Sequence, residues 1–162
     1  KEASNEALGE HEEKKKAPSV HFGGHALISP EYVPTEDDRL YFYQRLSEAE
    51  NTNQIKDVSS ELRDRFGPLP GPVASLFCVA QMRVSLVGSS VQTLKIMSSF
   101  CSVMLCAFFP FSSLKSIENK ISAKQHSYKI KEKGRDIIIS ASVPNISASL
   151  KTARYFINLF RV

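Results

Sequence analysis

Three carboxylates in one short segment have the clearest potential for chemistry in this chain. They lie in and just before ELRDRFGPLP, residues 61–70, which also contains two arginines and an aromatic residue. On a helical wheel with about 100° per residue, Asp57, Glu61 and Asp64 fall close together on one face. A helix carrying these residues would therefore present a row of three negative charges, which we call the acidic row.

The acidic row has two interpretations. Glu61 and Arg65 are four residues apart, so they can form a surface ion pair worth roughly 0.3–0.5 kcal/mol that serves only solubility. Alternatively, the row docks against arginines of another domain. Spacing alone favours the surface pair and leaves the docking interpretation open.

The opposite face of the same helix is apolar and predicts how the row is positioned. Its apolar residues, at spacings of three and four, are Ile55, Val58, Leu62 and Phe66. We expect this stripe to pack into the core, with Phe66 as a structural anchor. Gly67 and Pro68 should then end the helix and turn the chain into the next one.

Other candidate chemistry is weaker. The chain has no phosphate-binding loop, nucleophile elbow, HExxH zinc pair or CxxC pair, so we predict neither enzyme activity nor a cofactor. His21 and His25 could share a metal, but two glycines separate them and exposed loop histidines are favoured. We therefore predict no metal site.

Two further patterns are also given a structural interpretation. Cys101 and Cys106 lie in apolar runs and are predicted to be buried thiols rather than a redox pair. The segment KIKEKGR, residues 129–135, reads as a basic hairpin tip that is more often a solvated strand end than a phosphate contact.

Composition bounds the kind of protein. With 162 residues and 42% apolar content, the chain can form one real core. No apolar run reaches the roughly 18–20 residues that span a membrane, and three cysteines without framework spacing favour a reduced, cytoplasmic protein without a membrane partner. Because the chain opens on Lys1, we expect it to be a piece of a longer protein.

Charge divides the chain in two. Residues 1–67 contain nine basic and fourteen acidic residues, whereas residues 68–162 contain twelve basic and three acidic ones. An acidic half can face a basic partner, and a basic half can face nucleic acid or another acidic surface. Composition does not choose between them.

Apolar periodicity predicts helices in the first half of the chain. Residues 1–18 read as the end of an upstream helix with a linker, and the domain itself as residues 19–162, opening with an extended arm over 20–34. Thr35 is a candidate N-cap, with Asp38 as the capping-box acid. The predicted helices are 36–49, 52–66 and 70–88, the last of them central and buried.

Strands follow after Gly88. Two β-rich runs precede a helical pattern at 111–123, a hairpin over 126–143 turning at Glu132 to Gly134, and a last helix from Asn145. The predicted fold class is α+β, with N-terminal helices followed by two ββα units that share an antiparallel sheet.

The order of several motifs resembles a known family. The motifs are the arm Tyr32-Val33-Pro34, the helix Arg39-Leu40-x-x-Tyr43-x-Arg45-Leu46, the helix end Glu61-Leu62-x-Asp64-Arg65-Phe66-Gly67-x-Leu69-Pro70, and the pair Ala80-x-x-Arg83 before Gly88. Together they resemble the C-terminal domain of the bacterial transcription-repair coupling factor, Mfd. The resemblance is close over residues 28–88, and residues 91–162 follow the family's order of elements.

The resemblance implies a regulatory role. Family members use an ATP-driven DNA translocase to push stalled RNA polymerase and an N-terminal module to recruit the excision-repair protein UvrA. The C-terminal domain covers the UvrA-binding module of the same chain. The family's contact acids correspond to Glu61 and Asp64, which meet arginines of that module.

Two functions from different classes therefore remain. The first is an autoinhibitory interaction domain with UvrA and RNA polymerase as indirect partners. The alternative, motivated by the basic half, is a nucleic-acid-binding accessory domain of a DNA translocase. Affinity for DNA that falls steeply with salt would favour the alternative.

Overall fold

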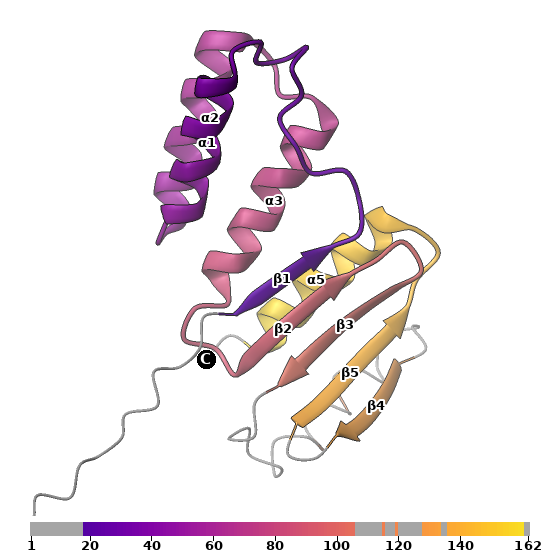
Figure 1. Ribbon diagram of the computed structural model, residues 1–162. Helices are drawn as coiled ribbons and strands as arrows, with labels where there is room; N and C mark the ends of the chain where they lie inside the picture. Colours follow the sequence, from indigo (N-terminus) through magenta and orange to yellow (C-terminus); the bar gives the residue numbers. More distant parts are fainter. Residues whose placement is uncertain (1–17, 106–114, 116–118, 120–127, 134–135, 161–162) are drawn as a thin grey trace, which may run out of the picture.

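Three helices lead into a sheet that carries a fourth helix on one face (Figure 1). The computed structural model describes residues 18–105, 115, 119, 128–133 and 136–160. The helices are α1 (Glu36–Glu48), α2 (Thr52–Phe66), α3 (Gly71–Ser85) and α5 (Ile146–Phe160). The strands are β1 (Ser19–Phe22), β2 (Val91–Ile96), β3 (Phe100–Leu105), β4 (Tyr128–Lys133) and β5 (Asp136–Ser142).

The fold is α+β, as the sequence predicts. The four described helices begin within one residue of their predicted starts, because caps, glycines and prolines mark these ends. The predicted helix over 111–123 and the segment 1–17 lie almost wholly outside the described residues, as does Cys106. Glu132 still belongs to β4, so the last hairpin turns later than the sequence predicts.

The sheet has the strand order β1-β2-β3-β5-β4. The pairs β2–β3, β3–β5 and β4–β5 are antiparallel, as predicted, whereas β1 pairs with β2 in parallel. The sheet is therefore mixed. The sequence missed this strand because Ser19–Phe22 is short and is followed at once by Gly23 and Gly24, which read as an irregular arm.

The capping prediction at α1 is right about the residue, because Thr35 occupies the N-cap position, but wrong about the capping box. Thr35 makes no side-chain cap hydrogen bond, and the Asp38 carboxylate instead binds Arg65 on α2. The capping box lies one helix later, where the Asn51 side chain accepts the backbone N–H of Gln54 and the Gln54 side chain accepts that of Asn51. A capping box needs a longer acceptor at its third position than Asp38 provides.

Two clusters of buried side chains form the core, and α3 joins them. Val73, Phe77 and Ala80 pack with α1 and α2, whereas Met82 packs against the sheet and α5. In Figure 1, α3 runs from the α1–α2 pair toward the sheet. This confirms the prediction that the third helix is central, because its apolar residues serve two packing surfaces.

Candidate functional site

The helix that carries the acidic row has both ends fixed. The Asn51–Gln54 capping box starts α2. At its end Gly67 adopts a φ of 86°, and its N–H donates to the Arg63 carbonyl at 2.9 Å. Left-handed backbone of this kind favours glycine, which gives Gly67 a physical role in ending the helix.

The apolar face of α2 holds the helix against α1 and α3. Ile55, Val58 and Leu62 are fully buried. Phe66 is only half-buried, with its ring 6.1 Å from the rings of both Tyr32 and Phe42. Pro68 is exposed.

The three carboxylates of the acidic row are not equivalent. Asp57 and Asp64 are exposed, whereas the Glu61 side chain is 32% exposed and lies against α1. Among the residues that the structure describes, neither Asp57 nor Asp64 has an ion-pair partner. Two acids of the row therefore face outward, and the third belongs to the contact between two helices.

Glu61 is held by two arginines. Arg45 of α1 donates to one carboxylate oxygen of Glu61, and Arg65 contacts the other oxygen at 3.5 Å. Arg65 also donates to Asp38 of α1 at 2.6 Å. We call these four residues the ion-pair network; two acids and two bases make it neutral overall.

Aromatic rings support the network. The Arg65 guanidinium lies 5.0 Å from the centre of the Phe66 ring and 5.5 Å from that of Phe42, and Arg45 lies 5.4 Å from the Tyr41 ring. The hydrogen bond with Asp38 raises the pKa of Arg65 above its ordinary value, so the guanidinium stays charged. Cation–π contacts of this kind favour charged arginines.

The surface-pair interpretation thus applies to Glu61, whereas the docking interpretation stays open for Asp57 and Asp64. The pair of Glu61 with Arg65 is present, as the spacing predicts, but Arg45 of another helix is the closer partner. Arg45 and Asp38 were missed as members of the site. Their spacing of seven residues on α1 places them on one face, a signal that becomes useful once α1 and α2 are known to pack antiparallel.

The remaining family-like motif residues hold the arm and the helix ends in place. The Tyr32 hydroxyl donates a hydrogen bond to the Gly67 carbonyl at 2.8 Å. Burial raises the pKa of Tyr32, so the hydroxyl keeps the proton that it donates. The Tyr43 hydroxyl accepts the Ile28 N–H at 2.7 Å. Arg39 donates to the carbonyls of the arm, and Arg83 to those at the end of α1.

A hollow between α1 and α2 opens beside the network. It is lined by Thr35, Asp37, Asp38, Tyr41, Glu61 and Arg65. Tyr41 is 44% exposed. The hollow between α1 and α2 therefore offers aromatic surface beside its charges.

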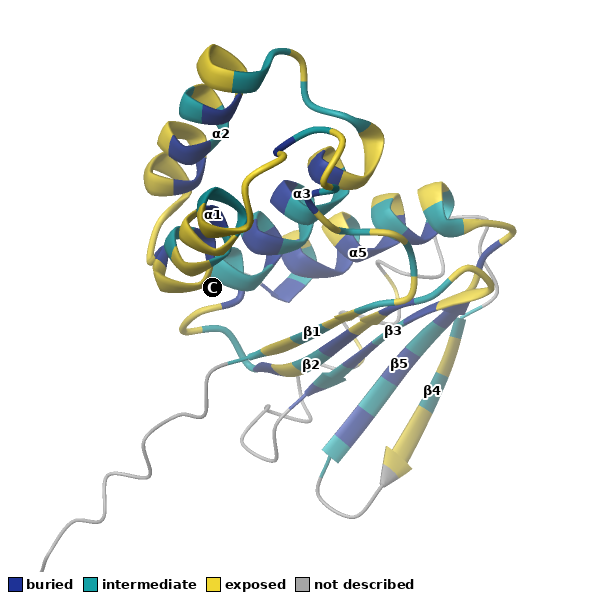
Figure 2. Cartoon of the chain, turned by 45° about the horizontal axis from the view of Figure 1, so that its top comes forward, coloured by how far each residue is buried: buried dark blue, intermediate teal, exposed yellow. Residues whose placement is uncertain are grey.

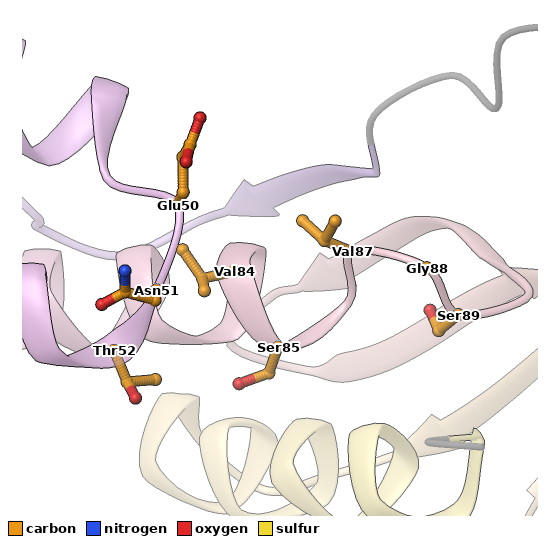
Figure 3. A pocket seen from close by; sticks show the side chains of 8 residues that line it. All are labelled: Glu50, Asn51, Thr52, Val84, Ser85, Val87, Gly88 and Ser89. Atoms are coloured by element: carbon orange, nitrogen blue, oxygen red, sulfur yellow. The ribbon is translucent and has the colours of Figure 1, made fainter.

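A second hollow lies where the α1–α2 turn meets the end of α3, and Figure 3 shows its lining side chains. These are mostly small and neutral, and the Glu50 carboxylate points away from the hydroxyls of Thr52 and Ser85. The arrangement does not bring an acid or base to a nucleophile.

Among the described residues the metal candidates are not brought together, and of the two thiol candidates only Cys101 is described. Within the described ranges, no three potential metal ligands come together, and His21 and His25 are both exposed. Cys101 is buried in the sheet core, where burial raises the pKa of its thiol to about 12. No helix in the described part of the chain combines the length and apolar character that crossing a membrane requires.

Comparisons with known proteins agree with this architecture. Residues 22–106 match the family model for the TRCF domain. The chain is 36% identical over 58 residues to the transcription-repair-coupling factor of Escherichia coli K12, covering 36% of this chain and 5% of the relative. It is 32% identical over 96 residues to that of Staphylococcus epidermidis ATCC 35984, covering 58% of this chain and 8% of the relative.

A solved structure extends the likeness to the whole domain. The crystal structure of the C-terminal domain of transcription-repair coupling factor superposes with a TM-score of 0.63 at 16% identity. The match covers 88% of this chain and 94% of that chain. The fold is thus shared, although the matched segments span less than a tenth of the curated relatives' length.

Proposed function

Because this chain belongs to the TRCF domain family, we propose that it is an autoinhibitory domain that masks the UvrA-binding module of a transcription-repair coupling factor. The parent protein would use ATP to translocate on DNA and act on stalled RNA polymerase. In that setting the domain regulates when UvrA is recruited, and it performs no chemical step itself.

The observation that carries the proposal is the outward position of Asp57 and Asp64. Both are exposed on a helix whose opposite face is fully buried, so they are presented on a rigid support. Exposed carboxylates without a partner in the described structure pair readily with arginines of another surface. Tyr41 on neighbouring α1 lines the hollow beside Glu61 and Arg65 and adds apolar area to the same contact.

Glu61 has a different part in this proposal. It is already paired with Arg45 and Arg65, so a partner arginine would have to share it or displace one of them. We therefore assign the direct contact chiefly to Asp64 and Asp57. Glu61 positions α2 against α1 and sits at the rim of the contact.

Charge pairs at an exposed rim suit a contact that must open. Exposed ion pairs contribute about 0–1 kcal/mol each, so several of them hold a closed state without locking it. A conformational change in the parent on polymerase and DNA can then shift the population toward the open state. UvrA would bind only after that shift.

A titration of this chain against the isolated UvrA-binding module tests the proposal. The double variant Asp57→Lys/Asp64→Lys should bind about 30-fold or more weakly, equivalent to about 2 kcal/mol, because like charges face the partner arginines. Its matched control is Glu48→Lys/Glu50→Lys, which makes the same change in charge on exposed residues of the α1 end. The control should bind with nearly unchanged affinity.

Equal loss of affinity in both double variants would mean that net charge, and not the α2 surface, governs binding. Unchanged affinity in the Asp57→Lys/Asp64→Lys variant would remove the docking role of these acids. In the intact parent, the same double variant should raise affinity for UvrA, because the closed state is destabilised.

A further inference from the structure

The sheet has a second face that points away from the described helices. Both α3 and α5 pack on the other face, where Leu94, Val103 and Ile139 are buried. Figure 2 shows the labelled helices together on one side of the sheet. Residues between the buried positions of each strand therefore face outward.

Strand register aligns polar residues across this second face. One row crosses all five strands through His21, Lys95, Ser102, Ser140 and Lys129, each paired with the next. The next row, two residues along, contains Ser19, Thr93, Met104, Ile138 and Lys131. We call these ten residues the open-face rows.

The open-face rows are basic and contain no acid. Lys95, Lys129 and Lys131 are exposed, as is His21. Lys95 lies on β2 and Lys129 on β4, three strand spacings or about 14 Å apart, while Lys129 and Lys131 are about 6.7 Å apart along one strand. The Ser102 hydroxyl lies between the two basic edges, whereas the Ser140 hydroxyl donates to the Lys129 carbonyl at 3.3 Å. The lysines and Ser102 thus offer donors along a line, as an extended polyanion requires.

An aromatic side chain lies beside the first row. Phe100 is two residues before Ser102 on β3, so it belongs to the same face, and it is 39% exposed. The buried Ser149 hydroxyl donates to the Phe100 carbonyl at 3.1 Å, which fixes this end of the strand. Tyr128, the aromatic residue within the basic hairpin, is instead packed toward the core near Phe156.

We propose that the open-face rows bind single-stranded nucleic acid, with phosphates at Lys95, Lys129 and Lys131 and one base stacked on Phe100. Surfaces that bind single strands combine a line of positive charge with an aromatic platform, and both occur here. An acidic peptide would use the lysines but would gain nothing specific from the ring. This binding goes beyond the proposed docking through α2 and lies on a different part of the molecule.

The test uses fluorescence anisotropy with a labelled 20-nucleotide oligothymidine and the whole chain. The variant Lys95→Gln/Lys131→Gln should bind at least about tenfold more weakly, and its salt dependence should be shallower by about 0.7 per lost phosphate contact. The matched control Lys56→Gln/Lys151→Gln removes the same charge from exposed sites on α2 and α5. It should keep nearly full affinity.

Phe100→Leu tests the stacking contact separately, because leucine retains apolar volume but not the aromatic ring. It should weaken binding by about fivefold or more without changing the salt dependence. Thermal melting of each variant checks that the domain remains folded.

Several outcomes would overturn the proposal. These are absence of oligothymidine binding at low salt, equal weakening in both double-lysine variants, or full affinity in Phe100→Leu. Equally strong competition by polyglutamate at matched charge would identify an acidic protein as the ligand instead. Because α2 is unchanged in the test variants, loss of binding to the UvrA-binding module is not expected from them.

Discussion

The helical region and the sheet region of this molecule are held together by different kinds of contact. In the helical region, 23–88, particular side chains bind particular backbone groups or ions, such as Arg83 at the end of α1 and Glu61 between two arginines. In the described residues of the sheet region, 19–22 and 91–160, backbone ladders and apolar packing predominate. The described part of the sheet region has no ion pair.

This difference explains why the motifs that resemble the family lie in one region of the chain. A guanidinium that reaches two carbonyls or a tyrosine that caps a turn cannot be replaced by another residue type without losing the contact. Apolar strand residues can exchange among Val, Ile and Leu at small cost if volume is kept. The motifs that resemble the family accordingly lie in the helical region.

The largest expected effect concerns the sheet core. Phe156→Ala should lower the free energy of unfolding by about 3–5 kcal/mol, because the fully buried ring leaves a cavity. Phe66→Ala, the matched change in the helical region, should cost roughly 2 kcal/mol since its ring is half-buried. Urea denaturation measures both. Equal costs would contradict the burial difference on which the comparison depends.

Cys101 reports on the same core by its chemistry. Its pKa of about 12, against an ordinary value of 9.0, lowers the thiolate fraction near pH 8 by about a thousandfold, so iodoacetamide should alkylate it only after unfolding. A raised folded-state pKa contributes stability below about pH 9 that is lost as pH rises toward 12. Mass spectrometry of alkylated peptides checks the prediction, and fast labelling of Cys101 in the folded chain would refute it.

Arg83 should be the most sensitive polar residue of the helical region. Arg83→Met keeps the apolar stem but leaves the Leu46 and Ala49 carbonyls without their donor, at a cost of about 2 kcal/mol. Arg154→Met, at an exposed arginine on α5, should cost less than about 0.5 kcal/mol. Thermal melting compares the two variants. A cost for Arg83→Met no larger than that for Arg154→Met would contradict the distinction between the two regions.

The smallest effect is expected from the ion-pair network. A double-mutant cycle with Arg45→Met and Glu61→Gln should give a coupling of about 0.5–1 kcal/mol that decreases with salt, because both side chains are about one-third exposed. Asp64→Asn should change stability by only a few tenths of a kcal/mol. A coupling near zero at low salt would mean that Glu61 is as free as Asp64.

Periodicity and turn residues by themselves determined most of the secondary structure. Ile55, Val58 and Leu62 repeat at helical spacing, and Gly67 followed by Pro68 marks a helix end, because these effects act over a few residues. The same local reasoning placed Asp57 and Asp64 on the outer face of α2. It also predicted a central third helix. The strands of the two pairs β2–β3 and β4–β5 were predicted in the same way.

Only the tertiary structure decided which charges were already paired. Arg45 is 16 residues from Glu61 and Asp38 is 27 residues from Arg65, so no local pattern joins them until α1 packs against α2. The parallel pairing of β1 with β2 and the row from His21 to Lys129 have the same origin. Contacts between residues far apart in the chain depend on how the elements pack, and the sequence of any one element does not contain that information.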